Sequence, residues 1–225
     1  MRLGALEAVN LALYIGALQI GPLPVMVALH LTSPVVLIAA DVARRRRPAS
    51  CIAALEMALV VGAITLVAVA VPAGSSTGGV LAGSALALAS AVALAVLISQ
   101  VAHEAVGQDP DVAAGLQLLV AAILTAPLAI TAAPAVGSVG WLLLVGLGLL
   151  GPGFGFYWRA LRGLDAPLAG ILGLNEAVVA SIIGALTFSA AIGPATLGAA
   201  ALVLAAVALE LRGNTSRLRH NLAGP

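Results

Sequence analysis

The sequence predicts an all-α polytopic membrane protein with about eight transmembrane helices. Three observations support this fold class. The chain of 225 residues is 62% hydrophobic and only 8% charged, whereas a soluble domain is about half apolar and a quarter charged. Apolar segments long enough to cross a bilayer follow one another along the chain, and the basic residues fall into alternate connections between them. One water-soluble core cannot bury this much apolar surface, so the solvent is lipid.

A helix needs about 20 apolar residues to cross the hydrocarbon, and roughly 17 to 25 are acceptable. Charges and Pro/Gly/Ser clusters divide the chain into such segments at about 3–20, 22–42, 50–71, 79–101, 112–132, 138–158, 166–189 and 194–211. The first is interpreted as a span and not a signal peptide, because Glu7 and Asn10 interrupt it and no Ala-x-Ala-like cleavage site follows. Residues 213–225 form a polar tail.

The basic residues indicate one orientation. With Met1 in the cytoplasm, every cytoplasmic connection or end contains arginine, and the outer connections contain none. The cytoplasmic arginines are Arg2, Arg44 to Arg47, Arg159, Arg162, Arg212, Arg217 and Arg219. This is the positive-inside distribution. The Ala-, Gly- and Leu-rich composition without lysine favours a GC-rich bacterial genome. The sequence therefore predicts a bacterial cytoplasmic (inner) membrane protein with both termini cytoplasmic.

The sequence lacks the motifs of several classes of function. The single Cys51 excludes an intrachain disulfide and a multi-cysteine metal site. HExxH, CxxC, P-loop and GxSxG motifs are absent, and no GxGxxG follows a plausible strand. No basic patch with interleaved aromatic residues points to nucleic acid. We expect no cofactor and no metal. The expected partners are the lipid bilayer and a small-molecule substrate, and a homodimer is left open.

Several side chains near span ends are interpreted as structural and not as functional. Trp141, Tyr157 and Trp158 lie at the two ends of the sixth span and are interpreted as interfacial anchors. Glu7 lies one to two turns from a cytoplasmic end and is expected to reach the interface, and Gln117 is given no role.

Two spans are expected to be irregular. Pro34 removes a backbone hydrogen bond and predicts a kink in the second span. The stretch "GLGLLGPGFG" (146–155) predicts a bent or locally unwound sixth span, which a transporter would use as a hinge. The alternative is close helix packing through small residues.

An internal repeat relates residues 13–36 to residues 156–179. At a constant offset Tyr14 aligns with Tyr157, and Pro24 aligns with Pro167. The first copy covers spans one and two, and the second covers spans six and seven. Because an odd number of spans separates them, the copies are expected to be inverted across the membrane. Inverted repeats are typical of secondary transporters, whose site lies near the midplane where the repeats meet.

Polar residues fall near the middle of both copies. They are His30, Thr32 and Ser33 in the second span, and Asn175 and Glu176 in the seventh, with Ser33 equivalent to Glu176. An intramembrane carboxylate usually faces a pathway, although Glu176 could instead be paired and hold two helices together. His30 could carry a coupling proton or form a neutral interhelical hydrogen bond. Thr32 and Ser33 could bind substrate or bond the preceding helical turn.

Three stretches carry a resemblance to a known family. "VALHLTSP" (27–34), "GSALALASAVALAV" (83–96) and "YWRALRGLDAPLAGILGLNEAVVAS" (157–181) resemble the drug/metabolite transporter superfamily, EamA-like, and within it the threonine/homoserine exporter-like branch. Glu176 falls on the Glu of that family's Glu-Pro motif. His30 stands where the exporter branch has Glu, and Ala177 replaces the Pro.

The resemblance implies two inverted five-helix repeats, cytoplasmic termini and alternating access. The expected organisation is the remainder of the first EamA-like repeat (1–72, three helices), the second repeat (73–212, five helices) and a cytoplasmic tail (213–225). On this alignment the chain is expected to begin at the family's third helix, so the resemblance implies a bundle truncated from ten helices.

The leading hypothesis is a secondary transporter, and specifically an exporter of small polar metabolites such as amino acids, with no enzymatic activity. Its substrate-binding residues are expected to be Glu176, His30, Asn175, Thr32 and Ser33. The hypothesis predicts pH-dependent transport that is lost in Glu176→Gln. The alternatives are a truncated, non-transporting membrane protein or assembly partner, and, as a weaker case, an intramembrane enzyme that uses His30 and Glu176 as an acid/base pair.

Overall fold

The computed structural model describes residues 1–45, 48, 50–68, 77–105, 107–131, 136–164, 166–174 and 194–222. In these residues the regular secondary structure is entirely helical, which confirms the all-α class for this part of the chain. The helices are α1 (Arg2–Ile20), α2 (Leu23–His30), α3 (Ser33–Ala43), α4 (Cys51–Ala68), α5 (Thr77–Glu104), α6 (Pro110–Thr131), α7 (Val136–Val145), the π-helix η1 (Gly146–Leu150), α8 (Gly151–Leu161), α9 (Ala166–Gly173) and α11 (Pro194–Leu222).

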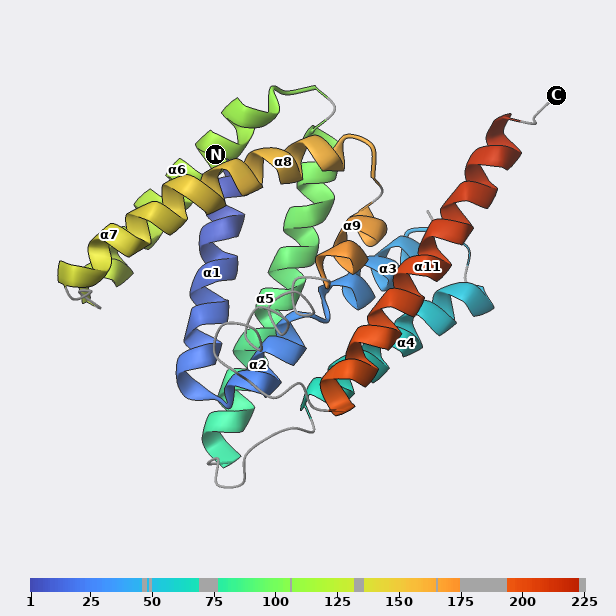
Figure 1. Cartoon of the computed structure of the whole chain (residues 1–225), viewed down its shortest axis with the longest axis horizontal. Coiled ribbons are helices and arrows are strands. Elements are labelled where there is room, and N and C mark those ends of the chain that lie inside the picture. Colours follow the sequence, from blue (N-terminus) through green and yellow to red (C-terminus); the bar gives the residue numbers. More distant parts are fainter. Residues whose placement is uncertain are drawn as a thin grey trace.

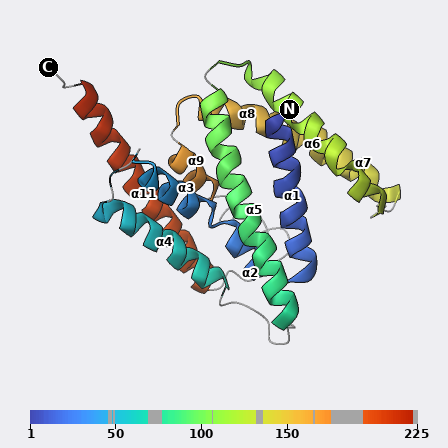
Figure 2. The same ribbon diagram turned by 180° about the vertical axis from the view of Figure 1, so that it is seen from behind.

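Two long helix pairs frame the molecule. On one side α1 packs along α5 and also contacts α6, and on the other side α4 packs along α11 (Figures 1 and 2). The short helices α2, α3 and α9 lie between these pairs: α2 and α3 contact both α5 and α4, and α9 contacts α3, α5 and α11. α8 contacts α6 and α5. The three short helices thus occupy the middle of the bundle, between longer ones.

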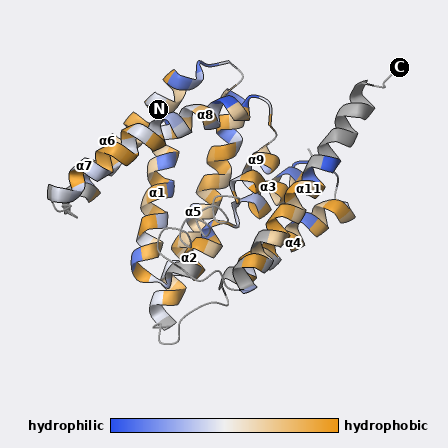
Figure 3. Cartoon of the chain, viewed as in Figure 1, coloured by the Kyte–Doolittle hydropathy of each residue, from blue (hydrophilic) through white to orange (hydrophobic). Residues whose placement is uncertain are grey.

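The membrane character of the chain is visible in its long apolar helices. Within the described residues, five stretches are long and apolar enough to cross a membrane: Arg2–Ile20, Val25–Ala43, Gly78–Glu104, Pro110–Leu128 and Gly137–Leu161. Two shorter apolar helices, Cys51–Leu66 and Leu197–Glu210, lie where further spans are predicted. Hydrophobic residues cover the helices, and hydrophilic ones gather at connections such as the α5–α6 turn (Figure 3). The count of eight stays a prediction, because residues 175–193 are outside the described residues.

Both predicted irregularities are confirmed. α2 ends at His30, and α3 begins at Ser33 with Pro34 in its first turn. Proline is tolerated there because an N–H in the first turn has no partner within the helix. The hydroxyl of Thr32, in the turn between them, donates to the Leu29 carbonyl oxygen at 2.7 Å. The sixth span contains the π-helical turn η1, closed by a hydrogen bond from the Gly151 N–H to the Gly146 carbonyl oxygen. Such π-turns inside α-helices are frequent at functional sites.

The bounds of two short helices match the predicted sequence repeat. α2 covers Leu23–His30 and α9 covers Ala166–Gly173, which are the same eight positions of the two copies. Each helix has its repeat-equivalent proline, Pro24 or Pro167, as its second residue. The two copies therefore share a short helix that begins and ends at equivalent residues.

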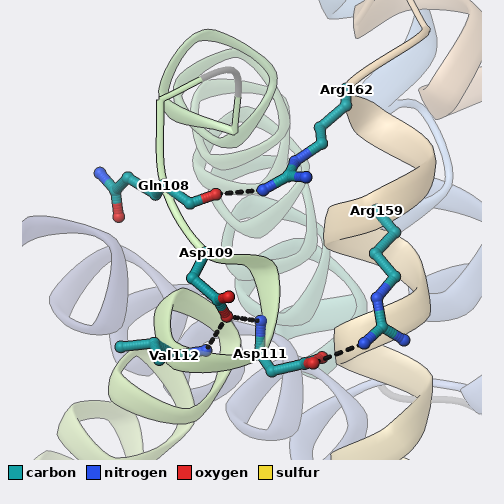
Figure 4. Close-up of polar contacts among 6 residues, drawn as sticks. All are labelled: Gln108, Asp109, Asp111, Val112, Arg159 and Arg162. Carbon is teal, nitrogen blue, oxygen red and sulfur yellow. Dashed lines mark hydrogen bonds and ion pairs between the residues drawn. The ribbon is translucent and has the colours of Figure 1, made fainter.

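The α5–α6 and α8–α9 connections are joined at one end of the bundle. The Arg162 side chain donates from Nε to the Ala105 carbonyl oxygen at 3.1 Å, and from Nη2 to the Gln108 carbonyl oxygen (Figure 4). Arg159 forms an ion pair with Asp111 at 2.5 Å. Arg162 thereby satisfies a carbonyl group at the end of α5 and another in the α5–α6 connection, which holds the end of α8 against that connection.

Close backbone approach explains the glycine at the α1–α6 contact. A Cβ atom added to Gly4 would lie 2.4 Å from Val120 Cβ and 2.7 Å from the Gln117 carbonyl oxygen. In lipid, where helices gain little from hydrophobic burial against one another, such close approach through small residues supplies much of the packing energy.

Gly4→Ala is therefore expected to destabilise the fold, by about 1–3 kcal/mol of overpacking strain. Gly16→Ala in the same helix is the control, because its Cβ would meet only Leu86 Cδ1 at an ordinary 3.5 Å. The measurement is the thermal unfolding midpoint of the purified protein in detergent. Equal midpoints for the two variants would contradict the close α1–α6 contact.

Candidate functional site

A cavity of about 640 Å³ lies between α1, α2, α3, α5, α6, η1, α8 and α9. Most of its wall is apolar, with leucines from α5, from η1 and from the turn between α2 and α3. Six lining residues have polar side chains: Glu7, Tyr14, His30, Ser33, Gln117 and Tyr157. The break between α2 and α3 contributes His30, Leu31 and Ser33, and the end of α9 contributes Gly173 and Leu174.

His30 is held by a hydrogen-bonded chain that joins three helices. Its Nδ1 lies 2.8 Å from Ser90 Oγ on α5, and Ser90 Oγ lies 2.8 Å from Asn10 Oδ1 and 3.2 Å from the Asn10 carbonyl oxygen on α1. Because the hydroxyl has one hydrogen and Asn10 offers the acceptors, His30 Nδ1–H is the donor to Ser90. When the ring is neutral, its lone pair is therefore on Nε2.

An aromatic contact fixes the plane of the same ring. Tyr14 of α1 stacks on His30, with ring centroids 4.0 Å apart and an interplanar angle of 22°. Both residues line the cavity, so the imidazole presents a defined edge to it. Tyr157, the repeat equivalent of Tyr14, lines the cavity from α8.

A second hydrogen-bonded chain lies nearer the start of α1. Gln117 Nε2 of α6 donates to Glu7 Oε2 at 3.2 Å, and Trp158 Nε1 of α8 donates to Gln117 Oε1 at 2.9 Å. An indole N–H can only donate, so the amide oxygen must face Trp158 and the amide NH₂ must face Glu7. The chain thus directs a neutral donor at the carboxylate.

The interpretations of these three residues as peripheral are wrong. Glu7 is 6% exposed and Gln117 is 3% exposed, and Trp158 is completely buried and not an interfacial anchor. The physical reason is their mutual hydrogen bonding, which satisfies polar groups that lipid could not. A pattern in α1 could have indicated this: Leu3, Glu7, Asn10, Tyr14 and Ala17 recur at helical spacing on one face.

The predicted site residues differ in placement. His30 and Ser33 line the cavity. Thr32 bonds the preceding turn, as its alternative interpretation states, and is not among the lining residues. Asn175 and Glu176 are outside the described residues, as is much of the predicted seventh span. The described residues contain no group of three His, Cys, Asp or Glu side chains that could hold a metal ion.

Removing the indole N–H should destabilise the Glu7 chain. Trp158→Phe leaves the buried Gln117 oxygen without its donor, at an expected cost of about 1–3 kcal/mol in unfolding free energy. Trp141→Phe is the matched control, because Trp141 is 70% exposed on α7. Thermal midpoints in detergent compare the two variants. Repeating Trp158→Phe in a Gln117→Met background should give a smaller loss, and an undiminished loss would contradict the hydrogen bond's role.

No protein-family model matches the sequence. No curated protein matches it either. Among the solved structures that resemble the chain, one described only as the crystal structure of a protein superimposes with a TM-score of 0.70. The match covers 89% of this chain and 70% of the solved one at 23% sequence identity. At that identity the likeness establishes the fold alone.

Proposed function

We propose that the protein is a secondary membrane transporter, an exporter of small polar metabolites such as amino acids, that binds its substrate in the central cavity. The observation that carries the proposal is the position of this cavity, where the α2–α3 break and the end of α9 meet inside a bundle of long apolar helices. Non-helical backbone at membrane depth is tolerated where it is buried in protein or lines a cavity. Here the α2–α3 break and the end of α9 both line the same cavity.

The predicted repeat supports the assignment of this cavity as a transporter's binding site. Interrupted helices at corresponding positions of two repeats are the best pointer to a transporter's binding site. α2 and α9 occupy equivalent positions, and Tyr14 and Tyr157 approach the cavity from equivalent positions. This supports an inverted-repeat, EamA-like bundle, in which rocking of one repeat against the other exposes the cavity to each side in turn.

The cavity suits a small polar solute. Ligand sites for small molecules are typically 300–1,000 Å³, largely apolar, with a few placed polar groups. The cavity of about 640 Å³ combines apolar walls with His30, Glu7 and Gln117. The π-helical turn η1 forms part of its wall through Leu149 and Leu150, and is the proposed hinge. Glu176 stays a predicted substrate-binding residue, together with Asn175.

Filling the cavity should abolish transport without unfolding the protein. In proteoliposomes loaded with a panel of labelled amino acids and amines, Gly153→Phe is expected to lower efflux at least tenfold. Gly153 lines the cavity, and a Cβ there meets nothing within 4 Å, so the ring can extend into the open space.

Gly148→Phe is the control, because Gly148 also has open space at Cβ but does not line the cavity. It should transport like the wild type. Unchanged efflux by Gly153→Phe, for every solute that the wild type moves, would contradict the proposed site. Absence of efflux by the wild type for the whole panel would contradict the proposed function.

A further inference from the structure

Among the described residues that line the cavity, Glu7 is the one carboxylate, and none is an arginine or a lysine. The chain as a whole contains no lysine. An ionised carboxylate that is buried in an apolar bundle is strongly unfavourable unless a positive charge or several hydrogen bonds accompany it. The described part of the wall supplies one hydrogen bond, from Gln117.

The Glu7 carboxylate keeps most of its acceptor capacity for the cavity. An ionised carboxylate has about four lone-pair sites, and Gln117 Nε2 occupies one of them on Oε2. Trp158 prevents the amide from rotating to present its oxygen, which would repel the carboxylate. The carboxylate is therefore held in position to accept a hydrogen bond from a donor inside the cavity. Gln117 and Trp158 are neutral and do not compensate its negative charge.

The rest of the wall favours a cation that carries N–H groups. Tyr14 and Tyr157 belong to the lining, and aromatic rings attract ammonium groups. Glu7 and Tyr14 are seven residues apart on one face of α1, so the Glu7 and Tyr14–His30 ends of the cavity are separated by about 10 Å along the helix. A short aliphatic amine fits between them, with its ammonium group at Glu7.

We propose that Glu7 is the ammonium-binding group of the site, and that the transported molecules carry a protonated amine. This inference rests on the proposed function and names the substrate class of the same cavity. Glu7 accepts N–H hydrogen bonds from the amine, Gln117 holds the carboxylate in position, and Trp158 fixes the orientation of Gln117.

The test compares two ligands of equal size, n-butylamine and 1-butanol, on the purified full chain in detergent. Binding is followed by saturation-transfer NMR in titrations at neutral pH. The wild type is expected to bind butylamine at least tenfold more tightly than butanol. Equal affinities would overturn the proposal, and this comparison depends on no variant.

Glu7→Gln keeps the side-chain volume and removes the charge, so it should lower butylamine affinity at least tenfold and leave butanol unaffected. Glu104→Gln, which removes a carboxylate at the end of α5 and outside the cavity, is the matched control and should bind like the wild type. Gel filtration and the ligand-free thermal midpoint establish that each variant is folded. Undiminished butylamine binding by folded Glu7→Gln would overturn the proposal.

Transport separates this inference from the proposed function. If proteoliposomes move a neutral or anionic solute, and Glu7→Gln moves it unchanged while Gly153→Phe does not, the ammonium site is wrong and the transporter stands. If Gly153→Phe has no effect on any transported solute, the proposed function fails first.

Discussion

The need to satisfy polar side chains inside an apolar bundle is the constraint on which this structure depends. Lipid offers no hydrogen bonds, so polar groups on membrane helices must find partners within the protein. One face of α1 carries three such groups, and each contacts a different helix. The contacts are Glu7 with Gln117 of α6, Asn10 with Ser90 of α5, and Tyr14 with His30 of α2. Together they determine how the helices around the cavity are placed.

These contacts also explain why the cavity is polar where it is. Glu7 is restrained by a hydrogen bond from Gln117, and His30 is restrained by its hydrogen bond with Ser90. Both restrained groups retain hydrogen-bonding capacity, on the carboxylate and on Nε2, and both line the cavity. A site whose ligand groups are positioned before the ligand arrives loses less conformational entropy on binding. The interrupted helix α2–α3 brings one of these groups to the cavity, and the continuous helix α1 brings the other.

The sequence predicts the helical membrane class, the break at Pro34 and the irregular sixth span, because apolar length, proline and glycine act locally. It predicts His30 and Ser33 as candidate site residues, because a polar group in mid-span stands out. It does not predict the burial of Glu7 and Trp158, because positions near span ends have an ordinary interfacial explanation. Their burial depends on Gln117, which lies 110 residues from Glu7 and 41 residues from Trp158. Tertiary contact of this kind leaves only a faint local pattern, the polar face of α1.

The most direct measurement of the central claim is water access to Ser33. This side chain lines the cavity yet is only 4% exposed. After exposed Cys51 is replaced by serine, Ser33→Cys and Val9→Cys can be treated in membranes with a charged, membrane-impermeant thiol reagent. Val9 is 52% exposed. It lies on the side of α1 opposite Glu7 and Tyr14 and is expected to face lipid. Ser33→Cys is expected to react and Val9→Cys is not, since reaction requires a thiolate in contact with water. Failure of Ser33→Cys to react from either side of the membrane would contradict a solute-accessible cavity between the interrupted helices.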